Sequence, residues 1–295
     1  MKNVGVIGLG AMGLGVARNL LRKGFAVHVC DVRPDAVQAF ALEGGIACAH
    51  PAELAQHCAV LIVLVVDADQ TESVLFGPQG AAAALRTGSV VIASATCHPD
   101  SIAGLGAQLA ERGVYLLDAP VSGGVVGAAG GTLTLMTSGA QEAYGLCEDV
   151  LAAISARVYR LGPQIGLGSK VKIINQLLVG VHVAAAAEAM ALGIREGVEP
   201  SLLYEVLSNS AGNSWAFTDR GPRMAAGDFT TCTALDIFVK DLALVLETAR
   251  SSRFPLPLAS AAYQMFASAS SAGFGREDDS AVIKSFPGIK LPNAA

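Results

Sequence analysis

The chain has 295 residues, of which 52% are hydrophobic and 15% charged, and its formal net charge is -5. These values allow one or two domains with large buried cores, and an acidic balance without a run of Lys or Arg argues against nucleic acid or a membrane surface as a partner. The six cysteines are scattered, with no C-x-x-C pair, so we expect no metal site and no disulfide framework, a pattern typical of a cytoplasmic protein.

A glycine motif lies between the first predicted strand and the first predicted helix. Residues 2–7 are an apolar run followed by Gly8-Leu9-Gly10-Ala11-Met12-Gly13, and apolar residues then recur at helical spacing up to Gly24. In a dinucleotide-binding unit the first glycine permits the turn, the second lets the backbone approach the pyrophosphate, and the third packs the helix against the strand. We therefore predict that Gly8, Gly10, Ala11, Met12 and Gly13 contact a dinucleotide cofactor.

The second predicted strand, 26–30, ends in Asp31. A carboxylate at this place accepts hydrogen bonds from the adenosine ribose hydroxyls and repels a 2′-phosphate, which favours NAD over NADP. Arg33 leaves an alternative open, because an arginine there could pair with a phosphate or lie over the adenine ring. We expect NAD as the cofactor, with Asp31 and Arg33 among its contacts.

Strands and helices alternate as far as residue 162. Further strands are expected at 46–49, 59–66, 89–93, 114–117, 132–136 and 157–161, with helices at 52–56 and 99–112. After Pro163 the pattern is helical only. The prediction is an α/β protein in which an N-terminal Rossmann doubly wound parallel sheet, 1–162, is followed by an all-α C-terminal domain, 163–295, for substrate binding and oligomerisation.

An apolar stretch from Leu177 to Ile194 is long enough to raise the question of a membrane span. His182 and Glu188 interrupt it, so we interpret it as a helix buried on most sides in a domain or subunit interface. The apolar N-terminal run is interpreted as a strand and a glycine turn rather than as a signal peptide. No membrane partner is expected.

The stretch from Gly166 to Gln176 begins an apolar helix that carries two lysines. Residues three and four apart share a helix face, so Lys172 shares its face with Asn175 and Gln176, whereas Lys170 does not. Burial of this helix would bury the Lys172 cluster and require partners for it, and a ligand is one kind of partner. The alternative is that both lysines are solvated at the end of a surface helix.

Ser122 is followed by Gly123 and Gly124 in a glycine-rich segment that runs from Asp118 to Gly139. A hydroxyl beside unobstructed backbone N–H groups can hold a carboxylate. The alternative is a plain glycine turn between two strands.

Four segments occur in an order and spacing that resemble one known family. They are Gly8 to Gly13 with Asn19-Leu20, Asp118 to Gly139, Gly166 to Gln176, and Lys240-Asp241-Leu242-Ala243-Leu244. The family is that of the β-hydroxyacid dehydrogenases, which includes 3-hydroxyisobutyrate dehydrogenase, tartronate semialdehyde reductase and 6-phosphogluconate dehydrogenase. The resemblance spans nearly the whole chain and implies a homodimer or homotetramer that acts on a small hydroxy acid.

The resemblance also implies roles for single residues. The lysine of the third segment is the catalytic group of the family, and it aligns with Lys172. The serine and the two glycines that hold the substrate acid align with Ser122, Gly123 and Gly124, and Lys240 is expected to contact substrate and cofactor.

Two departures from the family pattern limit what is carried over. The two consecutive asparagines after the lysine read Asn175-Gln176 here, so only Asn175 is expected to bind substrate. The Ser-Thr pair after the fifth strand reads Ala95-Thr96, which leaves Thr96 as a cofactor contact. Val66 is expected in the cofactor site as well.

A later stretch resembles the branch of the family that acts on four-carbon sugar acids such as L-threonate. It reads Gly212-Asn213-Ser214-Trp215-Ala216-Phe217 and is followed by Arg220 and Arg223. An asparagine, a serine and a basic residue suit a substrate with several hydroxyls, and we expect Asn213 to bind it. Trp215 and Phe217 are interpreted as core residues capped by polar neighbours.

The sequence therefore predicts an NAD-dependent dehydrogenase in which neutral Lys172 accepts the hydroxyl proton of a hydroxy acid. Because unperturbed lysine has a pKa of about 10.4, the site has to favour the neutral form. Within the family the alternatives are a 3-hydroxyisobutyrate dehydrogenase and a tartronate semialdehyde reductase. From another class, the alternative is a non-catalytic dinucleotide-binding protein.

Overall fold

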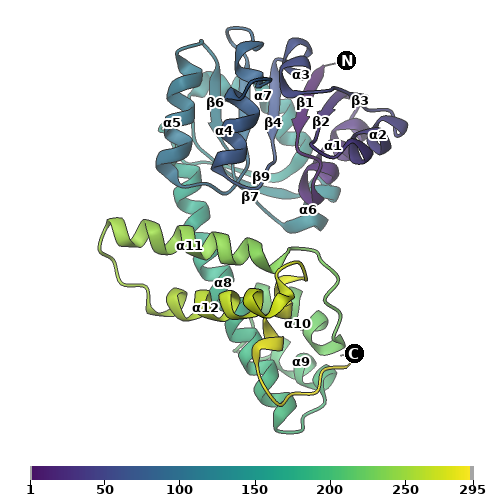
Figure 1. The fold of residues 1–295 in the computed structure, drawn as a ribbon, viewed down its shortest axis with the longest axis vertical. Coiled ribbons are helices and arrows are strands. Elements are labelled where there is room, and N and C mark those ends of the chain that lie inside the picture. The colour runs from purple at the N-terminus through teal and green to yellow at the C-terminus, as the bar shows by residue number, and fades with distance from the viewer. Residues whose placement is uncertain (1, 293–295) are drawn as a thin grey trace. The chain divides into compact units, whose positions relative to one another are not determined.

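The structure is a computed structural model that describes residues 2–292, and the chain divides after Lys172 into two compact units. The first unit is built on a six-stranded parallel sheet (Figure 1) with the strand order β3-β2-β1-β4-β5-β6. This is the doubly wound order, in which the chain starts in the middle of the sheet and builds outward to both edges. The strands are β1 Asn3–Ile7, β2 Ala26–Cys30, β3 Ile46–Ala47, β4 Val60–Val63, β5 Val90–Ala93 and β6 Tyr115–Asp118.

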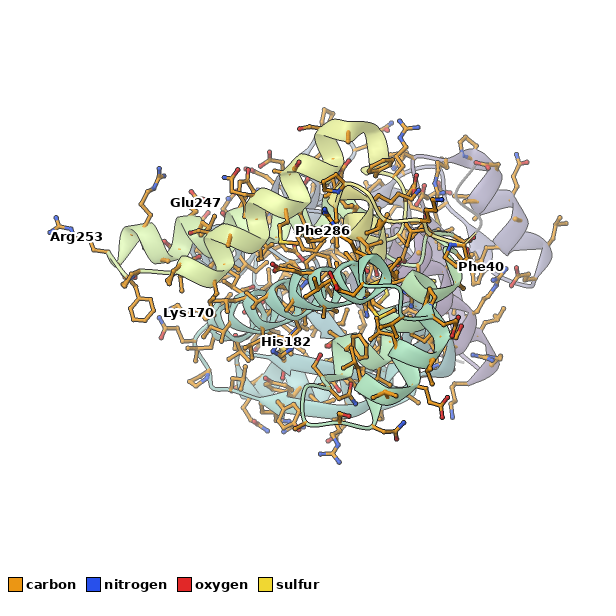
Figure 2. The ribbon with its side chains drawn as sticks, turned by 90° about the horizontal axis from the view of Figure 1, so that it is seen from below. Phe40, Lys170, His182, Glu247, Arg253 and Phe286 are labelled. Carbon is orange, nitrogen blue, oxygen red and sulfur yellow. The ribbon has the colours of Figure 1, made fainter. Side chains whose placement is uncertain are left out.

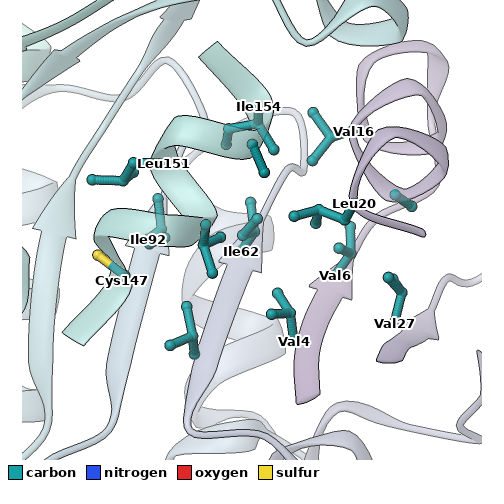
Figure 3. Packing of buried hydrophobic residues seen from close by; sticks show 14 of the residues in the cluster. Val4, Val6, Val16, Leu20, Val27, Ile62, Ile92, Cys147, Leu151 and Ile154 are labelled. Atoms are coloured by element: carbon teal, nitrogen blue, oxygen red, sulfur yellow. The ribbon is translucent and has the colours of Figure 1, made fainter. Parts of the chain in front are cut away.

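Alternate residues of these strands enter two separate cores, because successive side chains of a strand point to opposite faces. Val4 and Val6 of β1 pack with Val16 and Leu20 on one face (Figure 3), whereas Ile7 belongs to the core on the other face. The first face is covered by α1 Ala11–Arg22, α2 Pro34–Leu42 and α7 Gln141–Ile154, and the second by α3 Pro51–His57, α4 Ala68–Phe76 and α5 Pro99–Ala110. Burial on both faces accounts for the continuous aliphatic runs of the central strands.

A second, three-stranded sheet completes the first unit. It has the order β7-β8-β9, with β7 antiparallel to β8 and β8 parallel to β9. Its strands are β7 Val121–Ser122, β8 Leu133–Thr137 and β9 Ser155–Arg160, and the short helix α6 Gly124–Gly130 connects β7 to β8. The sequence pattern predicts strands over most of β8 and β9 but does not reveal that they leave the main sheet, because periodicity does not identify a strand's partner.

Every regular element that begins after β9 is helical among the described residues. These elements are α8 Leu167–Arg195, α9 Pro200–Ser208, α10 Trp215–Ala226, α11 Leu235–Ser251 and α12 Pro257–Ala269, followed by the short helices η2 Ser270–Phe274 and η3 Asp279–Ser285. In the second unit Phe238 and Phe266 stack with their ring centroids 5.2 Å apart inside the main core. The predicted fold class, a Rossmann sheet followed by a helical C-terminal region, is confirmed.

Among residues 2–292, one helix is long and apolar enough, by length and composition, to cross a membrane, and that helix is α8. A helix from the core of a soluble protein passes the same test. Only 39% of its most apolar window is buried within this chain, and Ile174, Leu178 and Leu192 are each more than half exposed. The described chain alone therefore does not bury this helix on most sides. The predicted burial in a domain interface is not met, and burial in a subunit interface stays a prediction.

Candidate functional site

The turn after β1 has the geometry of a dinucleotide-binding loop. Gly8 has a φ of 96°, which favours glycine, and a Cβ on Gly13 would lie 1.9 Å from the Gly8 carbonyl oxygen. A Cβ on Gly10 would meet no described atom within 4 Å, so the backbone there is open to a ligand. Gly10 is the N-cap of α1, Ala11 is exposed and Met12 is half-buried. The residues present thus fit a pyrophosphate at the switch point of the sheet.

Asp31 and Arg33 form a small network with this loop. Asp31 Oδ2 accepts a hydrogen bond from the Leu9 N–H at 2.5 Å, and Oδ1 accepts from the Arg33 N–H at 2.8 Å. Arg33 Nη2 donates to the Leu9 carbonyl at 2.9 Å. Burial acts to raise the pKa of Asp31, but the hydrogen bonds from Leu9 and Arg33 outweigh it and hold that pKa below its usual value. The carboxylate therefore stays ionised at the end of β2, as recognition of ribose hydroxyls requires.

Val66 and Thr96 follow β4 and β5 at the carboxyl edge of the sheet, the edge at which open α/β sheets bind their ligands. Val66 is 46% exposed, and its N–H donates to Gln70 Oε1 at 3.1 Å. Thr96 is half-buried. The topology brings both residues to the edge that carries the glycine loop.

Ser122 ends β7, and the two glycines after it shape the start of α6. Gly123 and Gly124 have φ values of 124° and 60°, which other residues rarely adopt. Gly127 N–H donates to the Gly123 carbonyl at 3.0 Å, and the N–H groups of a helix's first turn have no partner inside the helix. Ser122 is half-buried and Gly124 exposed, so this turn can present a hydroxyl and N–H donors to an acid group.

The two lysines of α8 differ in burial. Lys172 is 8% exposed, whereas Lys170 is exposed and projects from the ribbon in Figure 2. This is the order that helix phase predicts. Of the two, Lys172 has the environment that a buried base needs, because burial disfavours a charged group.

A chain of hydrogen bonds joins four polar residues of the second unit. Asn175 Nδ2 donates to Gln176 Oε1 at 3.1 Å, and Gln176 Nε2 donates to Asp241 Oδ2 at 2.6 Å. Asp241 Oδ1 also accepts from Lys240 Nζ at 2.7 Å. Gln176 and Asp241 are both buried.

The sequence analysis places Gln176 on the Lys172 face but gives it no contact with substrate, and it assigns no role to Asp241. Two signals were present in the sequence. Gln176 lies four residues after Lys172, on the same helix face, and Asp241 directly follows Lys240.

Asn213, in the segment before α10, makes two hydrogen bonds within the chain through its side chain. Asn213 Nδ2 donates to the Ser208 carbonyl at 2.8 Å, and Thr218 Oγ1 donates to Asn213 Oδ1 at 3.0 Å. The interpretation of Trp215 as a core residue is wrong: its side chain is 66% exposed, and its ring centroid lies 5.8 Å from the guanidinium carbon of Arg220. Phe217, at 5% exposure, is a core residue as expected.

Arg220 and Arg223 pair with carboxylates of the second unit. Arg220 Nη2 lies 2.8 Å from Asp279 Oδ2, and Arg223 Nη1 lies 2.9 Å from Asp278 Oδ1. Both aspartates are fully buried. These pairs tie α10 to the segment that enters η3 and give both arginines a structural use.

Two family models match the chain in succession. Residues 3–162 match the NAD binding domain of 6-phosphogluconate dehydrogenase. Residues 166–286 match a domain described as the NAD-binding domain of NADP-dependent 3-hydroxyisobutyrate dehydrogenase.

Relatives match over the whole length. The chain is 64% identical over 294 residues to L-threonate dehydrogenase of Cupriavidus necator, covering 100% of this chain and 99% of that protein. It is 47% identical to L-threonate dehydrogenase of Escherichia coli K12, covering 99% and 97%. The crystal structure of a 3-hydroxyisobutyrate dehydrogenase from Salmonella typhimurium is similar, with a TM-score of 0.92, 48% identity, and coverage of 97% of this chain and 100% of that one.

Proposed function

Because the chain belongs to the 3-hydroxyisobutyrate dehydrogenase-like family of NAD-binding β-hydroxyacid dehydrogenases, we propose that its substrate is L-threonate or a close four-carbon sugar acid, oxidised to the 2-oxo acid. The observation that carries this proposal is the 64% identity to an L-threonate dehydrogenase over the full chain. The Rossmann unit and its glycine loop agree with the use of NAD.

The proposed chemistry assigns the proton to Lys172. When bound, NAD supplies the hydride acceptor at C4 of its nicotinamide ring. Lys172 in its neutral form takes the proton of the substrate hydroxyl and returns it in the reverse direction, and its burial favours the neutral amine. Asn175 orients the hydroxyl that reacts.

Three further residues hold the substrate acid in this proposal. Ser122 donates its hydroxyl to the carboxylate, and Gly123 and Gly124 leave the backbone N–H groups of the turn accessible. Lys240, which is paired with Asp241 at 2.7 Å, contacts substrate or cofactor. Asn213 binds the distal hydroxyls with the part of its hydrogen-bonding capacity that Ser208 and Thr218 do not use.

Two features support NAD rather than NADP. The Asp31 carboxylate stays ionised at the end of β2, where it would repel a 2′-phosphate. Arg33 is already engaged with Asp31 and with the Leu9 carbonyl.

We also propose a homodimer or homotetramer in the cytoplasm. Support for self-association comes from large apolar side chains that are more than half exposed on neighbouring helices, Ile174, Leu178 and Leu192 on α8 and Leu202 and Val206 on α9. Ile174 with Leu178 and Leu202 with Val206 are four residues apart and so share a helix face, and apolar surface exposed together in this way is typical of protein contacts.

The test is a substrate panel followed by one pair of variants. L-threonate, D-erythronate, D-glycerate, 3-hydroxyisobutyrate and L-serine are assayed with NAD and with NADP by absorbance of the reduced cofactor. We expect the highest kcat/KM with L-threonate and NAD. Lys172→Ala should lose at least about 100-fold in kcat, while the control Lys170→Ala stays close to wild type because Lys170 is exposed.

The outcomes separate the alternatives. Activity confined to 3-hydroxyisobutyrate, the substrate named for the Salmonella relative, would reject the sugar-acid proposal. Turnover by Lys172→Ala within about tenfold of wild type would reject the general-base role. Cofactor binding without turnover on any substrate would favour a non-catalytic dinucleotide-binding protein.

A further inference from the structure

Asp118 is a buried carboxylate to which the proposed reaction assigns no step. It ends β6, is 1% exposed, and its side chain accepts four hydrogen bonds. Oδ2 accepts from the Ser169 N–H at 2.9 Å, the Gly166 N–H at 3.0 Å and the Ser138 hydroxyl at 3.1 Å, and Oδ1 accepts from the Ser169 hydroxyl at 2.8 Å. Burial raises the pKa of Asp118, and these hydrogen bonds work against that rise.

Three of the four donors belong to the start of α8. The N–H groups at a helix N-terminus have no partner inside the helix, and a carboxylate there is also favoured by the helix dipole. Ser138 reinforces the arrangement, because its hydroxyl donates to Asp118 and accepts from the Gly168 N–H at 3.1 Å. The N–H groups at the start of α8 therefore find acceptors in the Asp118 carboxylate directly and in the Ser138 hydroxyl that Asp118 holds.

Glycine at position 168 makes this close approach possible. A Cβ on Gly168 would lie 2.4 Å from the Met136 carbonyl oxygen and 2.9 Å from Asp118 Oδ2. The backbone of Asp118 is fixed as well, since it exchanges two hydrogen bonds with Ser138 at 3.0 and 2.8 Å. The start of α8 is thus clamped to the ends of two strands, β6 and β8.

Lys172 lies three residues after Ser169 on the same helix, about 4.5 Å further along its axis, and residues three apart share a face. A rotation or shift of the first turn would therefore move Lys172. We propose that Asp118 is the positioning residue for Lys172, holding the first turn of α8 in the register that aims the lysine at the reacting hydroxyl. This inference rests on the proposed function, in which Lys172 is the base.

The experiment compares Asp118→Ala, Asp118→Asn and Ser169→Ala with the control Ser155→Ala. Ser155 is a half-buried serine of the same unit whose hydroxyl donates to a helix carbonyl, that of Leu151, at 2.7 Å. Steady-state kinetics use the best substrate of the panel with NAD, each rate is divided by the folded fraction from thermal unfolding, and kcat is followed against pH.

We expect kcat of Asp118→Ala to fall about 100-fold, the order of loss that a small misplacement of a catalytic group produces. The KM for NAD should stay within about threefold of wild type, since the energetic link runs to α8 and not to the glycine loop. Asp118→Asn should recover to within about tenfold of wild type, because an amide can accept from the backbone N–H groups and donate to the Ser169 hydroxyl. If Lys172 leaves its buried position in Asp118→Ala, its amine regains solvent. The acidic limb of the profile of kcat against pH should then move toward the ordinary lysine pKa of about 10.4.

Several results would overturn the proposal. These are a kcat for Asp118→Ala close to wild type, an equal loss in Asp118→Asn, and an unmoved acidic limb. If Asp118→Ala does not fold, the two serine variants decide. A fall of about tenfold in kcat for Ser169→Ala alone supports positioning. Equal kcat values for Ser169→Ala and Ser155→Ala reject it. Activity retained by Lys172→Ala would instead sink the general-base role, whatever the Asp118 variants do.

Discussion

At the scale of single residues, the carboxylate of Asp31 connects cofactor choice with the stability of the first unit. Its oxygens accept hydrogen bonds from the N–H groups of Leu9 and Arg33, and these bonds hold its pKa below the usual value. A group whose pKa is lower in the folded than in the unfolded state stabilises the fold above the unfolded pKa, and that stability is lost as pH falls through the folded pKa.

In Asp31→Asn the free energy of unfolding should therefore depend less on pH in the acidic range than it does in wild type. The unfolded-state pKa of an aspartate is about 3.9, so wild type should lose stability below about pH 4 more steeply than the variant does. Thermal unfolding from pH 6 to pH 2 measures this, with the exposed carboxylate variant Glu196→Gln as a control. Parallel curves for wild type and Asp31→Asn would contradict the expectation.

At the scale of elements, the turn from β1 into α1 separates two uses of glycine. Gly13 is needed for packing, because a Cβ there would collide with the Gly8 carbonyl oxygen at 1.9 Å. Gly10 is needed for access, because a Cβ there meets nothing within 4 Å among the described atoms. Glycine is thus needed at these two positions of the motif for two different physical reasons.

This difference predicts opposite results for two alanine substitutions. Gly13→Ala should destabilise the protein by about 1–3 kcal/mol, the usual cost of overpacking. Gly10→Ala should cost no more than about 1 kcal/mol, the difference between glycine and alanine at an N-cap, but weaken NAD binding by about tenfold or more, since its methyl group faces the ligand side. Denaturant unfolding and NAD titration measure the two effects, and a destabilised Gly10→Ala that binds NAD normally would refute the assignment.

Local patterns predicted much of the fold and some of the site. The strand from Ala26 to Cys30 was predicted with its observed bounds, since an apolar run before an acid is a local signal. The separate sheet of β7, β8 and β9 was not predicted, because strand pairing is not local. Helix phase selected Lys172 over Lys170 for burial, but the links from Gln176 to Asp241 and from Ser169 to Asp118 span 65 and 51 residues and leave no periodic trace in the sequence.

At the scale of the whole molecule, the six cysteines form two classes. Cys232 is exposed, and the other five are buried, with no disulfide among them. Burial raises the pKa of Cys30 and Cys48 to about 11 and of Cys58 and Cys147 to about 12. Because the thiolate is the reactive form, those buried thiols are unreactive near neutral pH.

A thiol reagent such as DTNB at pH 8 should therefore modify one cysteine of the native protein rapidly and all six after unfolding. Cys232→Ser should abolish the rapid phase and leave five thiols in the unfolded protein. The measurement is the absorbance of the released thiol against time. A second rapid thiol in the native protein would contradict the burial of the other five.

The clamp at Asp118 bears on how this protein could be divided or recombined. The first family match ends at residue 162 and the second begins at residue 166, which suggests a crossover point between them. Yet the donors on Gly166 and Ser169 lie beyond that point and serve a carboxylate that lies before it. A chimera joined at 162 would pair the Asp118 of one parent with the helix start of the other, whereas a junction after Lys172 would inherit the clamp whole.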